Sequence, residues 1–407
     1  MQAINYRIIL TIDPANRISA QRPDDYDTAL IRELEFGSEI DGIPNRKLGL
    51  NRPQLLGPAN SYVERDWAAR RRVMDDHWEA ALEMLWFRQS DPAVSEEERR
   101  RWCEYGLARD EFADHGHRPY EIYFREGRRL RGRSRLTQAD TTPLPGMSRP
   151  PLHTDSIAFT EWYVDSHACT PRRVNGSLEE GKIMLHQETF SGQIPFDALL
   201  PEGVDNLTVP VCLSATHVAW NTVRLESTWM HLAESAAHAT VHAVRCHQNI
   251  AAIDRDGLLR TLAACGVALA ISNDLESTLG DETVAAAQYF STRGFLPDYD
   301  ARLAMPLDRG IDREWAWGWQ ADGIEAGPIA FARWVGLAAA YAEGAISRVE
   351  FAAMLPPAEL DGRGETNFTR GEALTILWRL VKSRPSSAGA SLPEEPLTSL
   401  PSSVSYI

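Results

Sequence analysis

The stretch Asn206–Ala239, NLTVPVCLSATHVAWNTVRLESTWMHLAESAAHA, constrains the fold of this chain more than any other. It begins with Leu207–Cys212, a short apolar run rich in β-branched residues, which predicts a central strand. After a polar turn, the residues from Thr228 to about Cys246 predict a helix. In α/β proteins, ligands bind where a strand ends in a loop before a helix N-terminus. The partly positive N–H groups there suit an anion or a polarised carbonyl. Small residues would let the predicted helix approach a flat ligand closely, but an ordinary, tightly packed helix explains them equally well. They are Ala233, Ser235, Ala236, Ala237 and Ala239.

Composition narrows the class of protein. A length of 407 residues allows two domains and a small third module. The net charge of -15, without a dense Lys/Arg face, disfavours binding to nucleic acid or to anionic lipid. Five scattered cysteines without a CxxC pair argue against a structural zinc site, an iron–sulfur cluster and a disulfide framework. The chain has no apolar run long enough to span a membrane and no signal peptide, so we expect a cytoplasmic protein.

Several further elements follow from periodicity and capping. Residues 6–12 predict a strand, and the apolar stripe of residues 63–87 predicts a helix. Ser95 and Glu98 form a capping-box pattern at the start of a second helix. Residues 118–132 and 180–190 also predict strands, although the first is unusually basic. Further helices are expected over residues 254–265 and from residue 281 onward.

The last part of the chain predicts a helical appendage and a tail. Helix starts at Asp308, Ser347 and Thr369 weakly resemble those of S-layer homology modules, which would attach a protein to a cell surface. Their unequal spacing favours ordinary capped helices instead. From about Ser383 the chain is rich in Ser and Pro, and we expect disorder.

Several segments of the chain, in the same order, resemble those of the FAD-dependent oxidoreductase family related to the heterodisulfide-reductase A-subunit flavoproteins. YFREGRRLRG at residues 123–132 and CLSATH at residues 212–217 carry the resemblance most specifically. QAINYRIILTIDPANR, YVDSHACTPRRV and YFSTRGFLPDYDARL add to it over roughly residues 1–300. The resemblance implies an α/β flavoenzyme with a partial Rossmann-like FAD-binding domain and a substrate domain.

The resemblance also implies domains and cofactor contacts. We expect a substrate-domain-like region over residues 1–195, the C-terminal part of the FAD-binding domain over 196–280, a helical region over 281–382 and a disordered tail over 383–407. The residues expected near the flavin ring and ribityl chain are Ser214, Ala215, Thr216, Arg224, Glu226 and Thr228. A helix N-terminus and an arginine stabilise the negative charge of a reduced flavin, which favours hydride acceptance.

The chain departs from this family at the pyrophosphate site. It contains no GxGxxG, the fingerprint that binds the FAD pyrophosphate, so it resembles the family with its first dinucleotide-binding half removed. At the start of the predicted helix, Ser227 stands where the family has proline, and Ala233 where it has glycine. FAD is therefore the expected cofactor, with its binding by this chain in doubt.

Two clusters in the matching segments contain candidate catalytic residues. Arg125, near Arg128 and Arg129, could hold a substrate carboxylate or hydroxyl or place a positive charge near the flavin. Surface salt bridges with acidic residues are the alternative. His167 is a candidate general base, oriented by Asp165 or by an acid more distant in the sequence.

Other chemistry is less well supported by the sequence. His238 and His242 lie four residues apart on the predicted helix, but without a third ligand no metal site is expected. Ser214 with His217 lacks the G-x-S-x-G context of a hydrolase.

The function expected from the sequence is hydride transfer from a small organic donor, a polyol, sugar or hydroxy-acid, to FAD. The alternative is a non-catalytic remnant of the family retained as a binding module. The sequence leaves the oligomeric state open.

Overall fold

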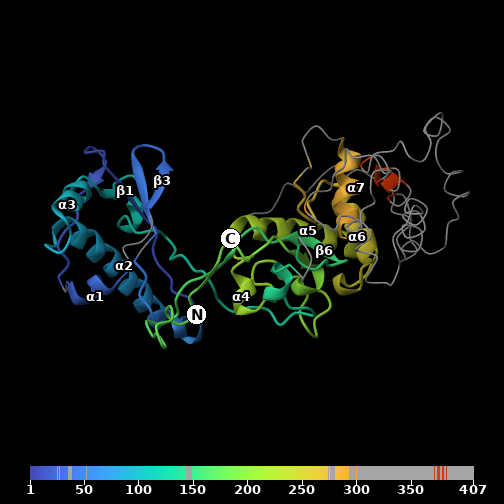
Figure 1. Cartoon of the computed structure of the whole chain (residues 1–407), viewed down its shortest axis with the longest axis horizontal. Coiled ribbons are helices and arrows are strands. Elements are labelled where there is room, and N and C mark those ends of the chain that lie inside the picture. The colour runs from blue at the N-terminus through green and yellow to red at the C-terminus, as the bar shows by residue number, and fades with distance from the viewer. Residues whose placement is uncertain are drawn as a thin grey trace, which may run out of the picture. The chain divides into compact units, whose positions relative to one another are not determined.

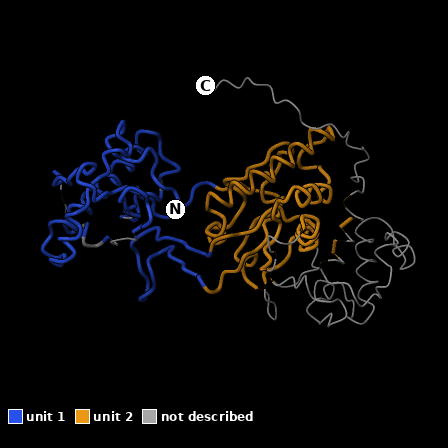
Figure 2. Tube along the Cα trace, turned by 90° about the horizontal axis from the view of Figure 1, so that it is seen from above, with its two compact units in different colours: residues 1–128, 163–186 blue, residues 129–162, 187–407 orange. Residues whose placement is uncertain are grey.

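The computed structural model describes residues 1–24, 26, 28–34, 39–51, 53–143, 149–273, 275, 280–292, 299, 371, 374, 375, 378, 379 and 382 (Figure 1). The chain divides into two compact units (Figure 2). Unit 1 comprises residues 1–128 and 163–186, and unit 2 comprises residues 129–162 and 187–407. The domain boundaries expected from the sequence, at residues 195, 280 and 382, stay predictions.

Unit 1 is built on a five-stranded sheet in which all neighbouring strands are antiparallel, in the order β2-β5-β1-β4-β3. The strands are β1 (Ile8–Thr11), β2 (Arg17–Ile18), β3 (Glu39–Ile43), β4 (Lys47–Leu50) and β5 (Gly106–Ala108). Strand β1 confirms the strand predicted over residues 6–12, and it occupies the centre of the sheet because its side chains Ile8 and Leu10 are fully buried.

Unit 1 also contains three helices, α1 (Thr28–Glu33), α2 (Trp67–Ser90) and α3 (Glu96–Cys103). Helices α2 and α3 share a core with the sheet, and α1 packs against α2. Ser95 Oγ accepts the backbone N–H of Glu98 at 3.2 Å, which confirms the predicted start of α3. Val73 and Leu85 of α2 share a core with Ile8 of β1, because the apolar stripe of α2 faces the sheet.

A hairpin of β7 (Val164–Ser166) and β8 (Ile183–Leu185) also belongs to unit 1. The N-terminal segment runs beside it, since the backbone N–H of Ala3 donates to the Ala168 carbonyl at 3.0 Å. On its other side this segment forms an isolated bridge between Asn5 and Tyr123.

The strand predicted over residues 118–132 is wrong, because these residues form only isolated bridges at Tyr123 and Gly132. Their arginines bond to separate parts of the chain rather than lining one ladder. Arg125 donates to the Ala3 carbonyl, and Arg128 pairs with Glu64.

Unit 2 pairs β6 (Ser156–Phe159) with β9 (Gln193–Pro195) in an antiparallel ladder. Its main helices are α4 (His217–Trp220), α5 (Glu226–Arg245), α6 (Arg255–Ala264) and α7 (Asp281–Ser291). Helices α5 and α6 both contact β6. The positions of α5, α6 and α7 confirm the helices predicted from Thr228, Asp254 and Asp281 onward. Short 3₁₀ turns at Pro58–Glu64, Ala113–His115, Gln138–Thr141, Phe196–Leu199 and Ile250–Ala252 connect the elements of both units.

The central strand predicted at Leu207–Cys212 is wrong. The segment is irregular, and the side chains of Leu207 and Val211 are 47% and 49% exposed. Pro210 lacks an N–H, and among the described residues the backbone bond that this segment makes as a donor runs from Val209 to the Leu199 carbonyl. A segment with the composition of a strand forms one only where a neighbouring strand supplies hydrogen-bond partners for its backbone.

The structure confirms the mixed α/β fold class. The helix starts predicted at Asp308, Ser347 and Thr369, and the tail from Ser383, lie outside the described residues. Within the residues that are described, no helix is both long and apolar enough to cross a membrane.

Candidate functional site

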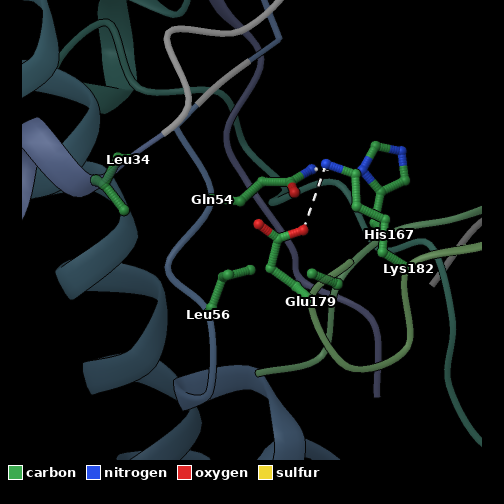
Figure 3. A pocket seen from close by; sticks show the side chains of 7 residues that line it. Leu34, Gln54, Leu56, His167, Glu179 and Lys182 are labelled. Carbon is green, nitrogen blue, oxygen red and sulfur yellow. Dashed lines mark hydrogen bonds and ion pairs between the residues drawn. The ribbon is translucent and has the colours of Figure 1, made fainter. Parts of the chain in front are cut away.

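A cavity of about 60 Å³ lies within unit 1 (Figure 3). The connection between β7 and β8 supplies most of its polar wall, and residues near α1 and before the turn at Pro58 supply the rest. The lining side chains are Leu34, Gln54, Leu56, His167, Ala168, Glu179 and Lys182. The cavity therefore combines a polar cluster with an aliphatic wall, as small-ligand sites do.

His167 is held from both sides of its ring. Its Nε2 lies 3.3 Å from Oδ1 of Asp165, and its Nδ1 lies 3.2 Å from Nε2 of Gln54. Asp165 and His167 lie on the same side of the chain because they are two residues apart at the end of β7. The amide nitrogen of Gln54 can only donate, so this geometry favours the tautomer with a lone pair on Nδ1 and hydrogen on Nε2.

Glu179 and Lys182 form the charged part of the cavity wall. Oε1 of Glu179 accepts a hydrogen bond from Arg173, and Oε2 lies 3.6 Å from Nζ of Lys182. The backbone N–H of Glu179 itself lowers the pKa of this carboxyl group, and Arg173 and Lys182 lower it further against the effect of burial. Glu179 is therefore ionised at neutral pH. Among the described residues, its Oε2 has no hydrogen-bond partner.

Arg125 is linked to the cavity through the N-terminal segment. Its side chain is buried, its Nη1 donates to the Ala3 carbonyl at 3.0 Å, and its guanidinium lies over the ring of Tyr123. The N–H of Ala3 in turn donates to the carbonyl of Ala168, a cavity residue. The structure thus gathers Arg125, Asp165 and His167 in unit 1, while Arg128 forms the alternative surface salt bridge.

The predicted flavin loop in unit 2 is packed into the interior. Ser214 and Ala215 are 1% and 5% exposed. The N–H of Ser214 donates to Ala198, and the N–H of Thr216 donates to Leu136. The carbonyl of Ala215 accepts from Arg129, and Thr216 Oγ1 caps α4. The loop therefore satisfies its own polar groups, and Ser214 and Ala215 offer almost no surface to a ligand.

Gly132 explains part of this packing. A Cβ on Gly132 would lie 2.7 Å from Cβ of Ser214, closer than real Cβ atoms approach. The glycine at the end of YFREGRRLRG thus lets the backbone press against CLSATH. Within unit 2, the last residues of the first motif thus contact the second motif.

The start of α5 is the part of unit 2 that fits a flavin. Its N-cap residue, Leu225, has no side chain that can accept a hydrogen bond from the first turn. The N–H groups of that turn can therefore donate to an anionic or polarised group of a ligand. Glu226 is exposed at this start, whereas Arg224 and Thr228 are buried. Thr228 Oγ1 is a buried hydroxyl without a hydrogen-bond partner in the described part of the chain. The helix start fits the group, and the loop before it does not.

Of the polar residues that line the cavity, sequence reasoning missed three: Gln54, Glu179 and Lys182. No local pattern distinguishes them from the surface residues around them. The LEEGK sequence before β8 could have indicated only a polar turn.

The family model described as FAD dependent oxidoreductase matches residues 1–262, a range that includes the cavity and the start of α5. No curated protein and no solved structure matches the chain. Since the family model covers more than half of the 407 residues, this chain belongs to the FAD dependent oxidoreductase family.

Proposed function

We propose that this protein oxidises a small organic substrate by transferring hydride to FAD, with unit 1 binding the substrate. The observation that carries this proposal is His167, which lines the cavity and lies 3.3 Å from Asp165. Asp165 and His167 are the catalytic pair, and Arg125 fixes the backbone of Ala3 behind them. A cytoplasmic location belongs to the same proposal.

His167 accepts the proton. Oxidation of an alcohol to a carbonyl releases a hydride from carbon and a proton from oxygen, and FAD when bound accepts the hydride. The substrate hydroxyl replaces the Gln54 amide at Nδ1 of His167 and passes its proton there. Asp165 stabilises the imidazolium that forms and keeps the ring in place.

Unit 2 contributes the residues that would hold the cofactor. The N–H groups at the start of α5, beginning at Glu226, would bind the polar edge of the flavin. Buried Arg224 adds positive charge behind them. In this proposal Ser214, Ala215 and Thr216 do not contact the flavin. They form the packed loop that precedes the helix start.

The relationship to the heterodisulfide-reductase A-subunit flavoproteins, and a pyrophosphate-binding half outside residues 1–407, belong to this proposal. Three observations support the second part. The sequence lacks a GxGxxG, the strand-like Leu207–Cys212 segment has no ladder partner among the described residues, and α5 exposes Met230, Val241 and Val244. Reading the DNA upstream of the Met1 codon for an in-frame strand–GxGxxG–helix tests it.

A non-catalytic binding module is the second candidate. The burial of Ser214 and Ala215 favours it, because these residues were expected to contact the flavin. Absorbance spectra of the purified full chain, before and after titration with FAD, separate the two functions. Bound flavin that is bleached anaerobically by an alcohol supports the oxidoreductase. A colourless protein that takes up no FAD supports the binding module.

A further inference from the structure

We infer that Gln2 is a positioning residue for His167. Its side-chain amide fixes the backbone of the proposed base and thereby keeps the imidazole ring within reach of Asp165. The inference rests on the proposed function only in treating His167 as the base. It starts from a hydrogen bond between two residues that lie 165 positions apart in the chain.

The backbone N–H of His167 has its partner outside the β7–β8 ladder. The register of that ladder ends with Ser166 opposite Ile183, one residue before His167. The N–H donates to Oε1 of Gln2 at 2.9 Å, and Gln2 is fully buried. Because Gln2 has no exposed surface, water does not compete for this bond. The end of β7 is therefore attached to the N-terminal segment exactly where the proposed base begins.

The N-terminal segment is the fixed partner in this contact. The residue after Gln2, Ala3, donates its N–H to the carbonyl of Ala168 at 3.0 Å, and its own carbonyl accepts from buried Arg125 at 3.0 Å. Ile4 is also fully buried. By contrast, residues 171–178 in the β7–β8 connection are all exposed. Gln2 thus holds the start of a connection that runs out to the surface.

The two ring contacts of His167 depend on where its backbone lies. Nε2 lies 3.3 Å from Oδ1 of Asp165, and Nδ1 lies 3.2 Å from Nε2 of Gln54. Both distances are at the long end of the range for hydrogen bonds, so a small shift of the ring away from either partner breaks that contact. The bond from Gln2 places the residue, and the two ring contacts then select its tautomer.

Loss of the Gln2 bond leaves the neighbouring backbone attached. The carbonyl of Cys169, two residues after His167, accepts from the N–H of Gly57 at 3.0 Å and from Nδ2 of Asn60 at 3.1 Å. These bonds do not involve the side chain of Gln2. A substitution at Gln2 should therefore leave unit 1 folded and act locally on the ring of His167.

The test is the titration of His167 by NMR of isotope-labelled histidine side chains, on the purified full chain without flavin. Loss of a signal in His167→Gln identifies the residue. Gln2→Met keeps the length of the side chain but removes the acceptor. We expect a mixture of tautomers and a titration midpoint at lower pH, because Asp165 then stabilises the imidazolium less. An unchanged tautomer and midpoint overturn the inference.

Two control variants separate positioning from a general loss of stability. Gln2→Glu keeps an acceptor oxygen at the same place, so its midpoint should not fall below that of the wild type. Gln89→Met is the matched control, because Gln89 also bonds backbone carbonyls in unit 1, those of Trp102 and Tyr105, at 2.8 and 2.9 Å. It should leave the titration unchanged. A midpoint shift in Gln89→Met as large as that in Gln2→Met overturns the inference.

A double variant tests whether the effect acts through Asp165. In the Asp165→Asn background, Gln2→Met should add no further shift, since the carboxylate that the ring would lose is already absent. Glu179 and Lys182, the other charged residues that line the cavity, stay unchanged in every variant. Shifts that add fully in the double variant contradict the positioning role.

Kinetics on protein loaded with FAD supply a second readout. Gln2→Met should lower kcat about tenfold with little change in KM, because the base is misplaced and the cavity lining does not include Gln2. A raised KM with unchanged kcat overturns the inference.

The outcomes for the two proposals are distinct. A shifted His167 titration in Gln2→Met, together with a wild-type protein that never reduces flavin, refutes the proposed function and leaves Gln2 as the residue that positions His167. Flavin reduction by the wild type, together with an unchanged titration in Gln2→Met, refutes the inference and leaves the proposed function standing.

Discussion

Nε2 of His167 lies 3.3 Å from Oδ1 of Asp165, with side chains that are 13% and 11% exposed. Gln54 contacts the opposite nitrogen of the same ring at 3.2 Å. The imidazole is thus fixed between a carboxylate and an amide at the edge of a cavity. A histidine held in this way has one tautomer favoured and one nitrogen directed at whatever replaces the amide.

His167→Gln should lower the rate of flavin reduction by about 100-fold or more, because the variant cannot take the substrate proton. The measurement is anaerobic flavin bleaching on protein loaded with FAD. Uptake of FAD by the same variant serves as the control and should persist. A rate that is unchanged at every pH would remove His167 from the mechanism.

Asp165→Asn should lower kcat with little change in KM, because Asp165 contacts the base rather than the substrate. Loss of its negative charge disfavours the imidazolium, so the acidic limb of the pH–rate profile, where the base becomes protonated, should move to lower pH. A purely structural role would lower activity without moving the profile. The comparison of the two profiles is therefore decisive for Asp165.

Arg125→Lys should destabilise unit 1 by about 1.5–3 kcal/mol. The ammonium keeps the charge but loses the fixed guanidinium that donates to Ala3 and lies over Tyr123. Chemical denaturation measures the change. Arg128→Lys is the control, since its exposed pair with Glu64 contributes little. Equal stability of the two variants would contradict the assignment of Arg125 as the buried anchor.

Gly132→Ala should destabilise unit 2 by about 1–3 kcal/mol, since its Cβ would clash with Ser214 at 2.7 Å. Gly127→Ala in the same motif meets no atom within 4 Å and should be close to neutral. Thermal unfolding of the pair tests whether the YFREGRRLRG glycine is required for contact with CLSATH. An equally stable Gly132→Ala protein would show that the contact relaxes easily.

His77 should make stability pH-dependent. Burial lowers the pKa of this imidazole in the folded state, although its bond to the Val73 carbonyl acts in the opposite direction. The unfolded chain binds a proton near pH 6.5, so the contribution of His77 is present above about pH 6.5 and is lost as the pH falls below it. Denaturation at pH 8, 6.5 and 5.5 should show a shallower loss for His77→Gln than for wild type. Parallel curves would contradict this.

The helices could be predicted because their signals are local. Ser95 and Glu98 are three residues apart, and the stripe of α2 repeats within each turn, so neighbours in the sequence decide where these helices begin and which face is buried. The same holds for the Asp165–His167 pair, since alternate residues of a strand point to one side.

The failures involve residues whose environment lies far away in the sequence. Leu207–Cys212 has the composition of a strand, but a strand forms only where neighbouring backbones supply partners. Ser214 and Ala215 were expected at the surface of a ligand site, and Gly132 and Leu136 cover them instead. No local pattern contains this information.

The sequence by itself determined the family, the mixed α/β class, the principal helices and the candidate base with its carboxylate. Only the tertiary structure decided that Gln54, 113 residues before His167, completes the cavity with Glu179 and Lys182. The physical reason is the range of the interactions involved. Capping and periodicity act over a few residues, whereas a cavity exists only after segments distant in the sequence have packed together and closed around it.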